Sequence, residues 1–529
     1  MLNHSQRLSA IVLAALCAAS ASQAQTATAP PAAPAAAEEA SFTVTGFVVD
    51  GENPLPADLT QATLRPFTGL HSGIERLQQA ALALEEVLRS RGYGFYRVVL
   101  PPQDIGGEIK LQMFKFTLGT LAIKGNQVFS NDNILRSLPQ LKPGSSPNTR
   151  ELARDLAVAN ESPSKRANVT FKQGDVADTI DATVDVVDSK TLTGFVSLNN
   201  IGNLATGYNR VTVGITHTNL FDLDHQATVT YTTSPSAPGQ VHQYGGYYRA
   251  PMYQWGGIIT AYYTNSSVNS GTIANLVNVT GRGEFLGVMY THYFAPAGDY
   301  RSFVSAGIDD KSFLNDRILT TGGVPLFPNY RTRPITVSYT GRIERGWGLW
   351  GYNLDYTRNL PLGGGNDGVN ANANRAGASS NWNAVRFGAD VTTSVLGNWM
   401  ATGRFKAQFS GQPLVPGEQF GIGGAQSIRG LNERVLSGDT GWQANLEILS
   451  PAFLENTRGV VFYDLGQVRR HNDAVMSFAA ANSIGVGLRW NMGTTLTANV
   501  DLAHVLNGLF YLPPGTSRDK LHFSLNWKY

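Results

Sequence analysis

The sequence predicts a transmembrane β-barrel of about sixteen antiparallel strands that follows two small α/β domains. Three observations support this fold class. Charged residues make up 15% of the 529 residues, whereas aromatic residues make up 10% and there are 56 glycines. From about residue 190 the chain consists of strand-like segments in which apolar and polar side chains alternate, as they do in outer-membrane strands. Before that point one order of strands and helices occurs twice, which indicates an internal repeat.

Residues 1–24 are predicted to be a secretory signal peptide. A short polar stretch precedes an apolar run over residues 8–19, and small side chains end the segment. A membrane-spanning helix needs about 20 apolar residues, and this run is shorter. We therefore expect the segment to direct export of the chain rather than to anchor it in a membrane. Cys17 is the only cysteine, and cleavage after Ala24 would leave neither thiol nor disulfide chemistry. Residues 25–41 are rich in Ala and Pro and are predicted to be a linker.

The two α/β domains are predicted to span residues 42–115 and 116–189. In each, an alternating strand is followed by two helices and two more strands, with helix ends marked by capping residues, glycine or proline. The predicted elements of the first domain are a strand at 42–49, a helix capped by Asp58, a helix from Ile74 to Gly92, and strands at 96–100 and 108–114. Those of the second are a strand at 118–124, helices beginning at Asn131 and Thr149, and strands at 169–171 and 180–187.

Residues 190–529 are predicted to form the barrel. In one of its strands Asn499 and Asp501 share one face, whereas Val500 and Leu502 share the other. We expect the polar face to line the lumen and the apolar face to contact lipid. Aromatic residues near strand ends are expected to form a girdle at the membrane interface; they are Tyr247, Tyr248, Tyr253, Trp255, Trp347, Trp350, Tyr352 and Trp399. Composition leaves a secreted β-sandwich or solenoid open as an alternative.

Two short segments near the C-terminal end are complementary in charge. A Gly-rich stretch without strand pattern presents Ile428, Arg429, Gly430 and Leu431, and an alternating strand contains Phe462, Asp464 and Gly466. A glycine-flanked arginine and a carboxylate on an alternating strand suit a buried ion pair in a barrel lumen. Judged from these residues alone, an exposed arginine in an ordinary turn is the commoner alternative.

With this order of elements, the chain resembles the two-partner secretion transporters (TpsB type, the haemolysin/haemagglutinin secretion-activation family) of the POTRA-barrel superfamily. Residues 428–431 are similar to the family's V-R-G-[YF] loop tip, and residues 462–466 are similar to its F-x-D-x-G strand motif. Residues 160–166 are similar to part of its second POTRA domain. The resemblance implies a barrel in the bacterial outer membrane and two POTRA domains in the periplasm. It also implies that the loop at residues 412–439 folds back into the barrel lumen, where Arg429 would form a bidentate ion pair with Asp464.

The resemblance also implies a function. Such a transporter captures an unfolded exoprotein through its POTRA domains and secretes it through its barrel without ATP. Its partners would be a large secreted exoprotein of adhesin, haemolysin or toxin type with an N-terminal secretion domain, the lipid of the outer membrane, and the barrel assembly machinery during biogenesis. We expect an extended client segment to pair with a strand edge at 96–100 or 169–171. The predicted client-binding residues are Arg91, Tyr96, Lys165, Arg166, Val169 and Phe171.

Other classes of function have less support from the residues. A net charge of +2 disfavours nucleic acid as a partner. The sequence contains no phosphate-binding loop, no G-x-S-x-G elbow and no metal-site spacing of histidines, so we expect no enzyme activity and no cofactor. One alternative is an assembly factor that inserts other barrels, although such relatives usually carry more POTRA domains. A passive porin is a weaker alternative, because a porin needs neither tandem domains nor the two motifs.

Overall fold

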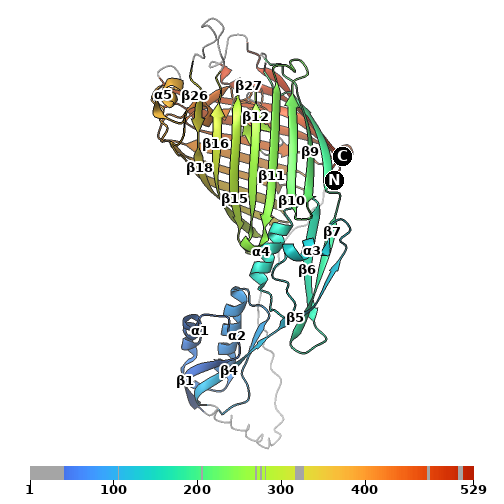
Figure 1. Cartoon of the computed structure of the whole chain (residues 1–529), viewed down its shortest axis with the longest axis vertical. Coiled ribbons are helices and arrows are strands. Elements are labelled where there is room, and N and C mark those ends of the chain that lie inside the picture. Colours follow the sequence, from blue (N-terminus) through green and yellow to red (C-terminus); the bar gives the residue numbers. More distant parts are fainter. Residues whose placement is uncertain are drawn as a thin grey trace, which may run out of the picture.

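The computed structural model describes residues 41–104, 106–203, 206–267, 271–273, 277–279, 282–315, 327–473, 477–509 and 516–529. The predicted signal peptide and residues 25–40 of the predicted linker lie outside these residues. Figure 1 shows two small α/β modules and a barrel stacked along the long axis of the molecule. Below, the first module is residues 41–115 and the second module is residues 116–189. The barrel rim beside the second module is the near rim, and the opposite rim is the far rim.

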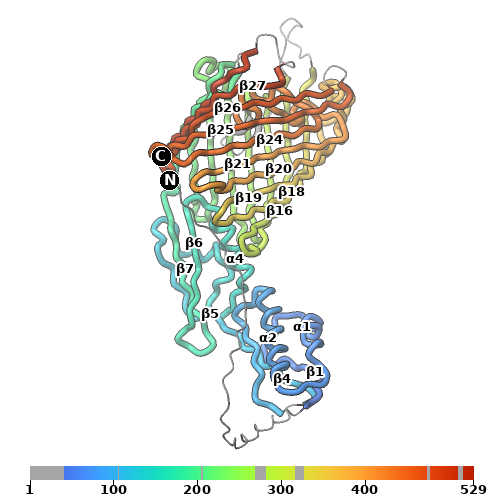
Figure 2. The backbone as a smooth tube through the Cα atoms, turned by 180° about the vertical axis from the view of Figure 1, so that it is seen from behind, coloured from blue at the N-terminus to red at the C-terminus, as the bar shows by residue number. Residues whose placement is uncertain are grey.

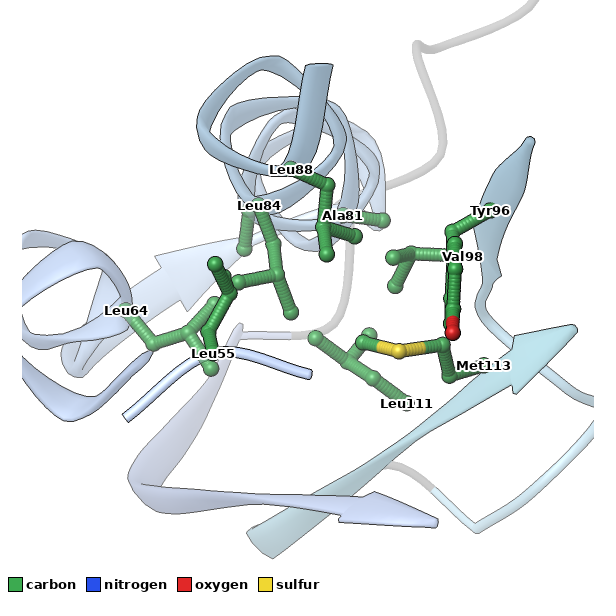
Figure 3. Close-up of a cluster of buried hydrophobic side chains, with 10 residues drawn as sticks. Leu55, Leu64, Ala81, Leu84, Leu88, Tyr96, Val98, Leu111 and Met113 are labelled. Atoms are coloured by element: carbon green, nitrogen blue, oxygen red, sulfur yellow. The ribbon is translucent and has the colours of Figure 1, made fainter. Parts of the chain in front are cut away.

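The first module is a four-stranded sheet with helices packed on one face. Its elements are β1 (Ser41–Asp50), α1 (Ala57–Leu64), η1 (Arg65–Phe67), β2 (Gly69–Ser72), α2 (Glu75–Ser90), β3 (Tyr96–Val99) and β4 (Gly107–Lys115). The strand order is β2-β1-β4-β3, so β2 and β3 are the edge strands. Figure 3 shows Leu84 and Leu88 of α2 on the helix face above Leu111 of β4, and all three side chains are fully buried.

Two details of the first module differ from the sequence prediction. A further strand, β2, lies between the helices and pairs with the first residues of β1. Four residues are too few to show a recognisable alternation, which is why the sequence did not reveal this strand. Asp58 lies in the first turn of α1, and Pro56 occupies the N-cap. The carboxylate of Asp58 still favours the helix there, because the first turn carries the positive end of the helix dipole.

The second module repeats the predicted order of strand, helix, helix, strand and strand. Its elements are β5 (Thr117–Lys124), α3 (Asn131–Ser137), α4 (Thr149–Ala159), β6 (Lys165–Gln173) and β7 (Thr179–Asp188). The strand order is β5-β7-β6, which leaves β5 and β6 at the edges. Both helices have capped N-termini: the Ser130 side chain accepts from the N–H of Asn133, and the Asn148 side chain accepts from the N–H groups of Arg150 and Glu151.

The two modules contact each other where α2 ends. Gly92 has a φ of +91°, and a Cβ at this position would lie 2.0 Å from Oδ1 of Asn148. The N–H of Thr149 donates to the carbonyl of Gly92 at 2.8 Å. Phe95 packs edge-on against Phe171 with ring centroids 4.8 Å apart. Position 92 therefore requires glycine both for its left-handed backbone and for this close approach.

The barrel is a closed antiparallel sheet. Its strand segments are β8 (Leu192–Asn199), β9 (Arg210–Leu220), β10 (His225–Thr233), β11 (His242–Met252), β12 (Gly257–Ser266), β15 (Gly283–Tyr293), β16 (Tyr300–Phe313), β17 (Tyr330–Thr332), β18 (Pro334–Arg345), β19 (Gly348–Asn359), β20 (Asn383–Ser394), β21 (Met400–Phe409), β24 (Thr440–Leu449), β25 (Thr457–Arg469), β26 (Phe478–Met492), β27 (Leu496–Asn507) and β28 (Asp519–Lys528). β17 and β18 both pair with β16 and are separated by Arg333 alone, so they form one interrupted strand. The seventeen described segments thus make sixteen spanning strands, as predicted, and β28 closes on β8. Figure 2 shows the wall from β16 to β27 from behind.

Shorter elements lie at the two rims and in the lumen. They are η2 (Tyr253–Trp255) at the near rim, β13 (Gly271–Ile273), β14 (Val277–Val279) and α5 (Gly368–Asn374) at the far rim, and η4 (Pro416–Glu418), β22 (Phe420–Ile422) and β23 (Leu436–Gly438) between β21 and β24. Within the described residues, no helix combines the length and the apolar character needed to span a membrane.

The faces of the barrel strands follow the predicted alternation. In β27 the residue Asp501 is 8% exposed and faces the lumen, whereas Leu502 is 52% exposed on the outer surface. Trp347 and Trp350 are exposed as well. Tyr253, in contrast, was wrongly assigned to the aromatic girdle: it is buried at the near rim against α4 of the second module. An aromatic residue at a strand end can face lipid or pack against a neighbouring domain. Only the position of the second module shows which of these environments Tyr253 occupies.

Candidate functional site

The candidate site lies inside the barrel, where residues 412–439 (the inner loop) turn back into the lumen. At the tip of the loop Ile428 and Leu431 are buried and pack with Val468 of β25 and Val505 of β27. Arg429 lies between them and is also buried. The tip therefore contacts the inner wall of the barrel through apolar side chains on both sides of one arginine.

Arg429 and Asp464 form a bidentate ion pair. The Nε of Arg429 donates to Oδ2 of Asp464 at 2.7 Å, and its Nη2 donates to Oδ1 at 2.7 Å. The backbone N–H of Arg429 donates to Oδ2 as well, at 3.1 Å, and Nδ2 of Asn445 donates to Oδ1 at 2.8 Å. The guanidinium carbon also lies 3.4 Å from the ring centroid of Phe462. Asp464 thus receives four hydrogen bonds in a site that water does not reach.

The ion pair belongs to a wider network on the barrel wall that sequence reasoning missed. The Nη1 of Arg429 donates to Glu447 of β24 at 2.7 Å and contacts Asp501 of β27 at 3.5 Å. Arg489 of β26 donates to Asp501 at 2.6 Å, and Arg404 of β21 contacts Glu447 at 3.4 Å. The available signal was a lone Asp, Glu or Arg in each of β24, β26 and β27, and a pair of basic residues in β21. Such charges become partners only through strand register, which the sequence does not show.

The glycine of the loop-tip motif has a steric reason. Gly430 has a φ of +96°, and a Cβ there would lie 2.6 Å from Cγ2 of Val505. Its N–H donates to Nε2 of His522 on β28 at 2.9 Å. On the other side of the arginine, Asn445 donates to the carbonyl of Ser427. The tip is thus held through its backbone on both sides of Arg429, which limits the positions that the guanidinium can adopt.

The prediction that a client segment pairs with the strand edge at residues 96–100 is wrong, because the outward-facing amides of β3 already have partners. Tyr96 is buried in the core of the first module. Its N–H donates to the carbonyl of Tyr93, and the N–H of Val98 donates to Oε1 of Glu85 at 2.8 Å. The amides that face away from β4 are therefore already paired within the module, so β3 has no free donor at these positions for an added strand.

Lys165 was also wrongly assigned to client binding, because the structure buries it between the second module and the barrel. Its Nζ donates to Oδ2 of Asp224, in the turn between β9 and β10, at 2.7 Å, and to Oδ1 of Asn133 at 2.8 Å. The hydroxyl of Tyr253 donates to the same oxygen of Asp224 at 2.5 Å. Arg136 of α3 donates to the carbonyl of Asp222 at 2.8 Å. Lys165 therefore joins the second module to the near rim.

The remaining predicted client-binding residues stay accessible. Arg91 and Arg166 are exposed, and Val169 and Phe171 are half-buried on the edge strand β6. On the outer edge of β6, the side chain of Asn160 bonds to the backbone of Ala167. It accepts from the N–H of Ala167 at 2.7 Å and donates to its carbonyl at 2.9 Å. Alternate residues of an antiparallel strand direct their backbone groups to the same side, so Val169 and Phe171 also present theirs to the open edge.

Helix α4 of the second module contains a buried carboxyl group that predicts a pH dependence. Asp155 is fully buried beside Arg154, and its burial raises its pKa to about 6. The folded state therefore binds a proton between pH 3.8 and about 6 that the unfolded state has lost. This contribution to stability is present at low pH and is lost as the pH rises through 6.

We expect the amides of α4 to exchange hydrogen more slowly at pH 5 than at pH 7.5, after correction for chemical exchange rates. The expected difference in local stability is on the order of 2 kcal/mol. The Asp155→Asn variant should lose this pH dependence, as hydrogen exchange of the full-length protein in detergent would show. An unchanged pH dependence in the variant would contradict the assignment to Asp155.

Comparisons with known proteins agree with this architecture. The sequence model of the haemolysin secretion/activation proteins ShlB/FhaC/HecB matches residues 179–489, more than half of the chain. The model of the ShlB-type POTRA domain matches residues 42–115. The outer membrane transporter CdiB of Escherichia coli is 23% identical over 484 residues, which cover 86% of this chain and 78% of CdiB. The heme/hemopexin transporter protein HuxB of Haemophilus influenzae is 24% identical over 159 residues, or 30% of this chain and 28% of HuxB.

Solved structures have the same fold. CdiB from Escherichia coli matches with a TM-score of 0.73 and 19% identity, covering 94% of this chain and 93% of that chain. CdiB from Acinetobacter baumannii matches with a TM-score of 0.70 and 18% identity, covering 92% of this chain and 90% of that chain. The match to the family over more than half of the sequence, together with the barrel and the N-terminal POTRA domain, places the protein in the bacterial outer membrane. The chain belongs to the ShlB/FhaC/HecB family of haemolysin secretion/activation proteins, the TpsB transporters of two-partner secretion.

Proposed function

We propose that the protein secretes one large exoprotein across the outer membrane, and that the inner loop must leave its position in the lumen for the client to pass. The observation that carries the proposal is the buried pair of Arg429 and Asp464, which holds a loop inside the transport path. A buried ion pair contributes little net stability but favours one specific conformation over others. Such a pair suits a loop that must occupy one defined position when the transporter is idle.

The lumen beside the inner loop supports the same proposal. A cavity of about 730 Å³ lies between the loop and the barrel wall, and charged side chains from both line it. They include Lys311, Arg386 and Lys406 of the wall and Glu418 and Glu433 of the loop. A path lined by charged side chains suits an unfolded polypeptide, whose backbone groups need hydrogen-bonding partners during passage.

We infer that the second module is a second POTRA domain and that its β6 edge receives the client. An extended segment of the client would add to β6 as a further strand, with backbone hydrogen bonds at Val169 and Phe171. Arg166 lies near the start of this edge and is exposed. The sequence contains no phosphate-binding loop, and folding of the client outside the cell would draw the chain through the pore without ATP.

The proposed client edge makes a specific prediction for Val169. The Val169→Pro variant removes an outward-facing N–H while leaving the β6–β7 ladder intact, because proline is tolerated at such edge positions. Loss of one hydrogen bond from the client complex is expected to lower secretion about fivefold. The measurement is the amount of client in the medium relative to the amount of assembled transporter. The Val169→Thr variant keeps the N–H and should secrete normally; equal secretion by both variants would exclude this edge.

The proposed function itself is tested by quantitative proteomics of the medium, cell surface and outer membrane, with and without the gene. Loss of one large protein from the medium or surface, with other barrels unchanged, is the expected result and would identify the client. A general fall in outer-membrane barrels would instead indicate an assembly factor, and no change in any fraction would contradict a role in secretion.

A further inference from the structure

The base of the inner loop is held by a second buried carboxylate, Asp439, at the last residue of the loop. Asp439 immediately precedes β24 at the far rim, which is the extracellular rim because the POTRA domain lies on the periplasmic side. It is fully buried. Its Oδ1 accepts from Nη1 of Arg375 and from the N–H of Leu414 at 2.8 Å. Its Oδ2 accepts from Nη2 of Arg375 at 2.6 Å and from the N–H of His471 at 2.7 Å. The carboxylate is therefore well satisfied and costly to leave without its partners.

Arg375 comes from a different extracellular segment, residues 360–382 between β19 and β20 (the outer loop), which contains α5 and lies at the far rim in Figure 1. Its guanidinium also donates to the carbonyl of Leu414 at 2.9 Å and to that of His471 at 3.0 Å. One arginine thus connects the outer loop, both ends of the inner loop, and the segment after β25. A lysine could not make these contacts together, because it lacks the planar fork of donors.

Apolar packing joins the same two loops. Ala371 and Ala378 of the outer loop are buried together with Val415 of the inner loop and with Phe313 and Tyr330 of the wall. The hydroxyl of Tyr330 accepts from the N–H of Gly417 at 2.8 Å. The first part of the inner loop therefore lies between the outer loop and the barrel wall.

The inner loop has a further charged contact close to this base. Glu418 is buried, and its Oε1 accepts from Nζ of Lys311 at 3.2 Å and from the hydroxyl of Thr332 at 3.0 Å. These contacts hold the loop against the wall, but they do not involve the outer loop. Among these charged contacts, Arg375 is therefore the residue through which the position of the outer loop can act on the base of the inner loop.

We propose that Arg375 is a positioning residue that clamps the base of the inner loop to the outer loop. The inner loop then leaves the lumen only when the outer loop moves with it or when the contact between Arg375 and Asp439 opens. The clamp is independent of the pair of Arg429 and Asp464, which holds the tip. The importance of the clamp for transport rests on the secretion function proposed above, whereas the clamp itself does not.

The test is hydrogen exchange with mass spectrometry on the full-length protein in lipid, with no client present. In the Arg375→Gln variant we expect exchange at residues 412–420 to become at least tenfold faster, while residues 425–432 at the tip keep their protection. In the Arg429→Ala variant we expect faster exchange at residues 425–432, while residues 412–420 keep their protection. Faster exchange in the outer loop alone, with residues 412–420 still protected, would overturn the proposal and leave Arg375 a purely local role.

Two further variants complete this experiment. Arg345→Gln removes a half-exposed contact with Asp299 at the near rim. It should leave exchange at residues 412–420 and at residues 425–432 unchanged. Arg375→Lys keeps the charge and is expected to expose residues 412–420 partially; if Arg375→Gln fails to assemble, full protection in the lysine variant overturns the proposal. Secretion by assembled Arg375→Gln is expected to fall several-fold. Normal secretion despite an exposed loop base would uphold the clamp but contradict its role in transport.

Discussion

Replacing Arg429 by alanine is expected to reduce secretion of the client at least tenfold while the barrel still assembles. The substitution leaves Asp464 fully buried without its bidentate partner and also takes the guanidinium away from Glu447. Breaking a buried ion pair in this way costs about 3–5 kcal/mol, because the remaining charge is uncompensated. The cost falls on the conformation in which the tip lies at the wall, so the loop no longer returns to one defined idle position. We expect secretion to fall because a loop without that position occupies the lumen in many arrangements and does not leave it in step with the client. The measurement is client in the medium, normalised to transporter with the heat-modifiable mobility of a folded barrel.

Two variants separate the geometry of the tip from its charge. Arg429→Lys keeps the charge but cannot reach both oxygens of Asp464 at once, so we expect intermediate secretion. Arg345→Ala removes an exposed ion pair and should have no effect, since such pairs contribute little. Wild-type secretion by Arg429→Ala would show that the pair is not needed for transport.

Replacing Lys165 by alanine is expected to release the second module from the barrel. The substitution would leave Asp224, which is almost completely buried at the contact, without its cation. The expected loss is about 3–5 kcal/mol of docking free energy. Cleavage by a protease between β7 and β8, at residues 189–191, should become at least tenfold faster, because the docked module now restricts that segment. The measurement is the rate of cleavage in purified full-length protein.

The same strand provides a matched control for Lys165. Lys172 also lies on β6, but its side chain is 71% exposed and its contact with Asp181 is 3.5 Å long. Lys172→Ala should therefore leave the cleavage rate unchanged. The double variant Lys165→Met with Asp224→Asn removes both buried charges and should be cleaved more slowly than Lys165→Ala. Faster cleavage of the double variant would show that the ion pair itself is not what holds the module.

Much of the architecture could be predicted because it depends on local patterns. The helix face of Leu84 and Leu88 repeats every three to four residues, and the alternation around Asp501 repeats every two. The short strand β2 escaped because its four residues carry too little pattern. Arg429 and Asp464 were matched through two motifs, each of which lies within a few residues of the chain.

The errors concern residues whose environment is set by other parts of the chain. A lysine such as Lys165 is usually exposed, and nothing near it in the sequence indicates a carboxylate from the turn after β9. Tyr96 begins an edge strand, yet groups of its own module already accept hydrogen bonds from the outward-facing amides of that strand. Asp439 was not singled out at all, because its partner Arg375 lies in a separate extracellular loop.

Periodicity and motifs within a few residues were enough to predict most of the succession of elements, the face of each long strand and the two motifs at the inner loop, because each of these is a local property of the chain. Tertiary structure alone decided which charges are partners: Arg429 with Glu447, Lys165 with Asp224, and Arg375 with Asp439. The physical reason is that a buried charge must be compensated by whatever group the fold brings within a few ångströms. Strand register, barrel closure and domain docking determine that group, and each of these is a long-range property of the folded chain.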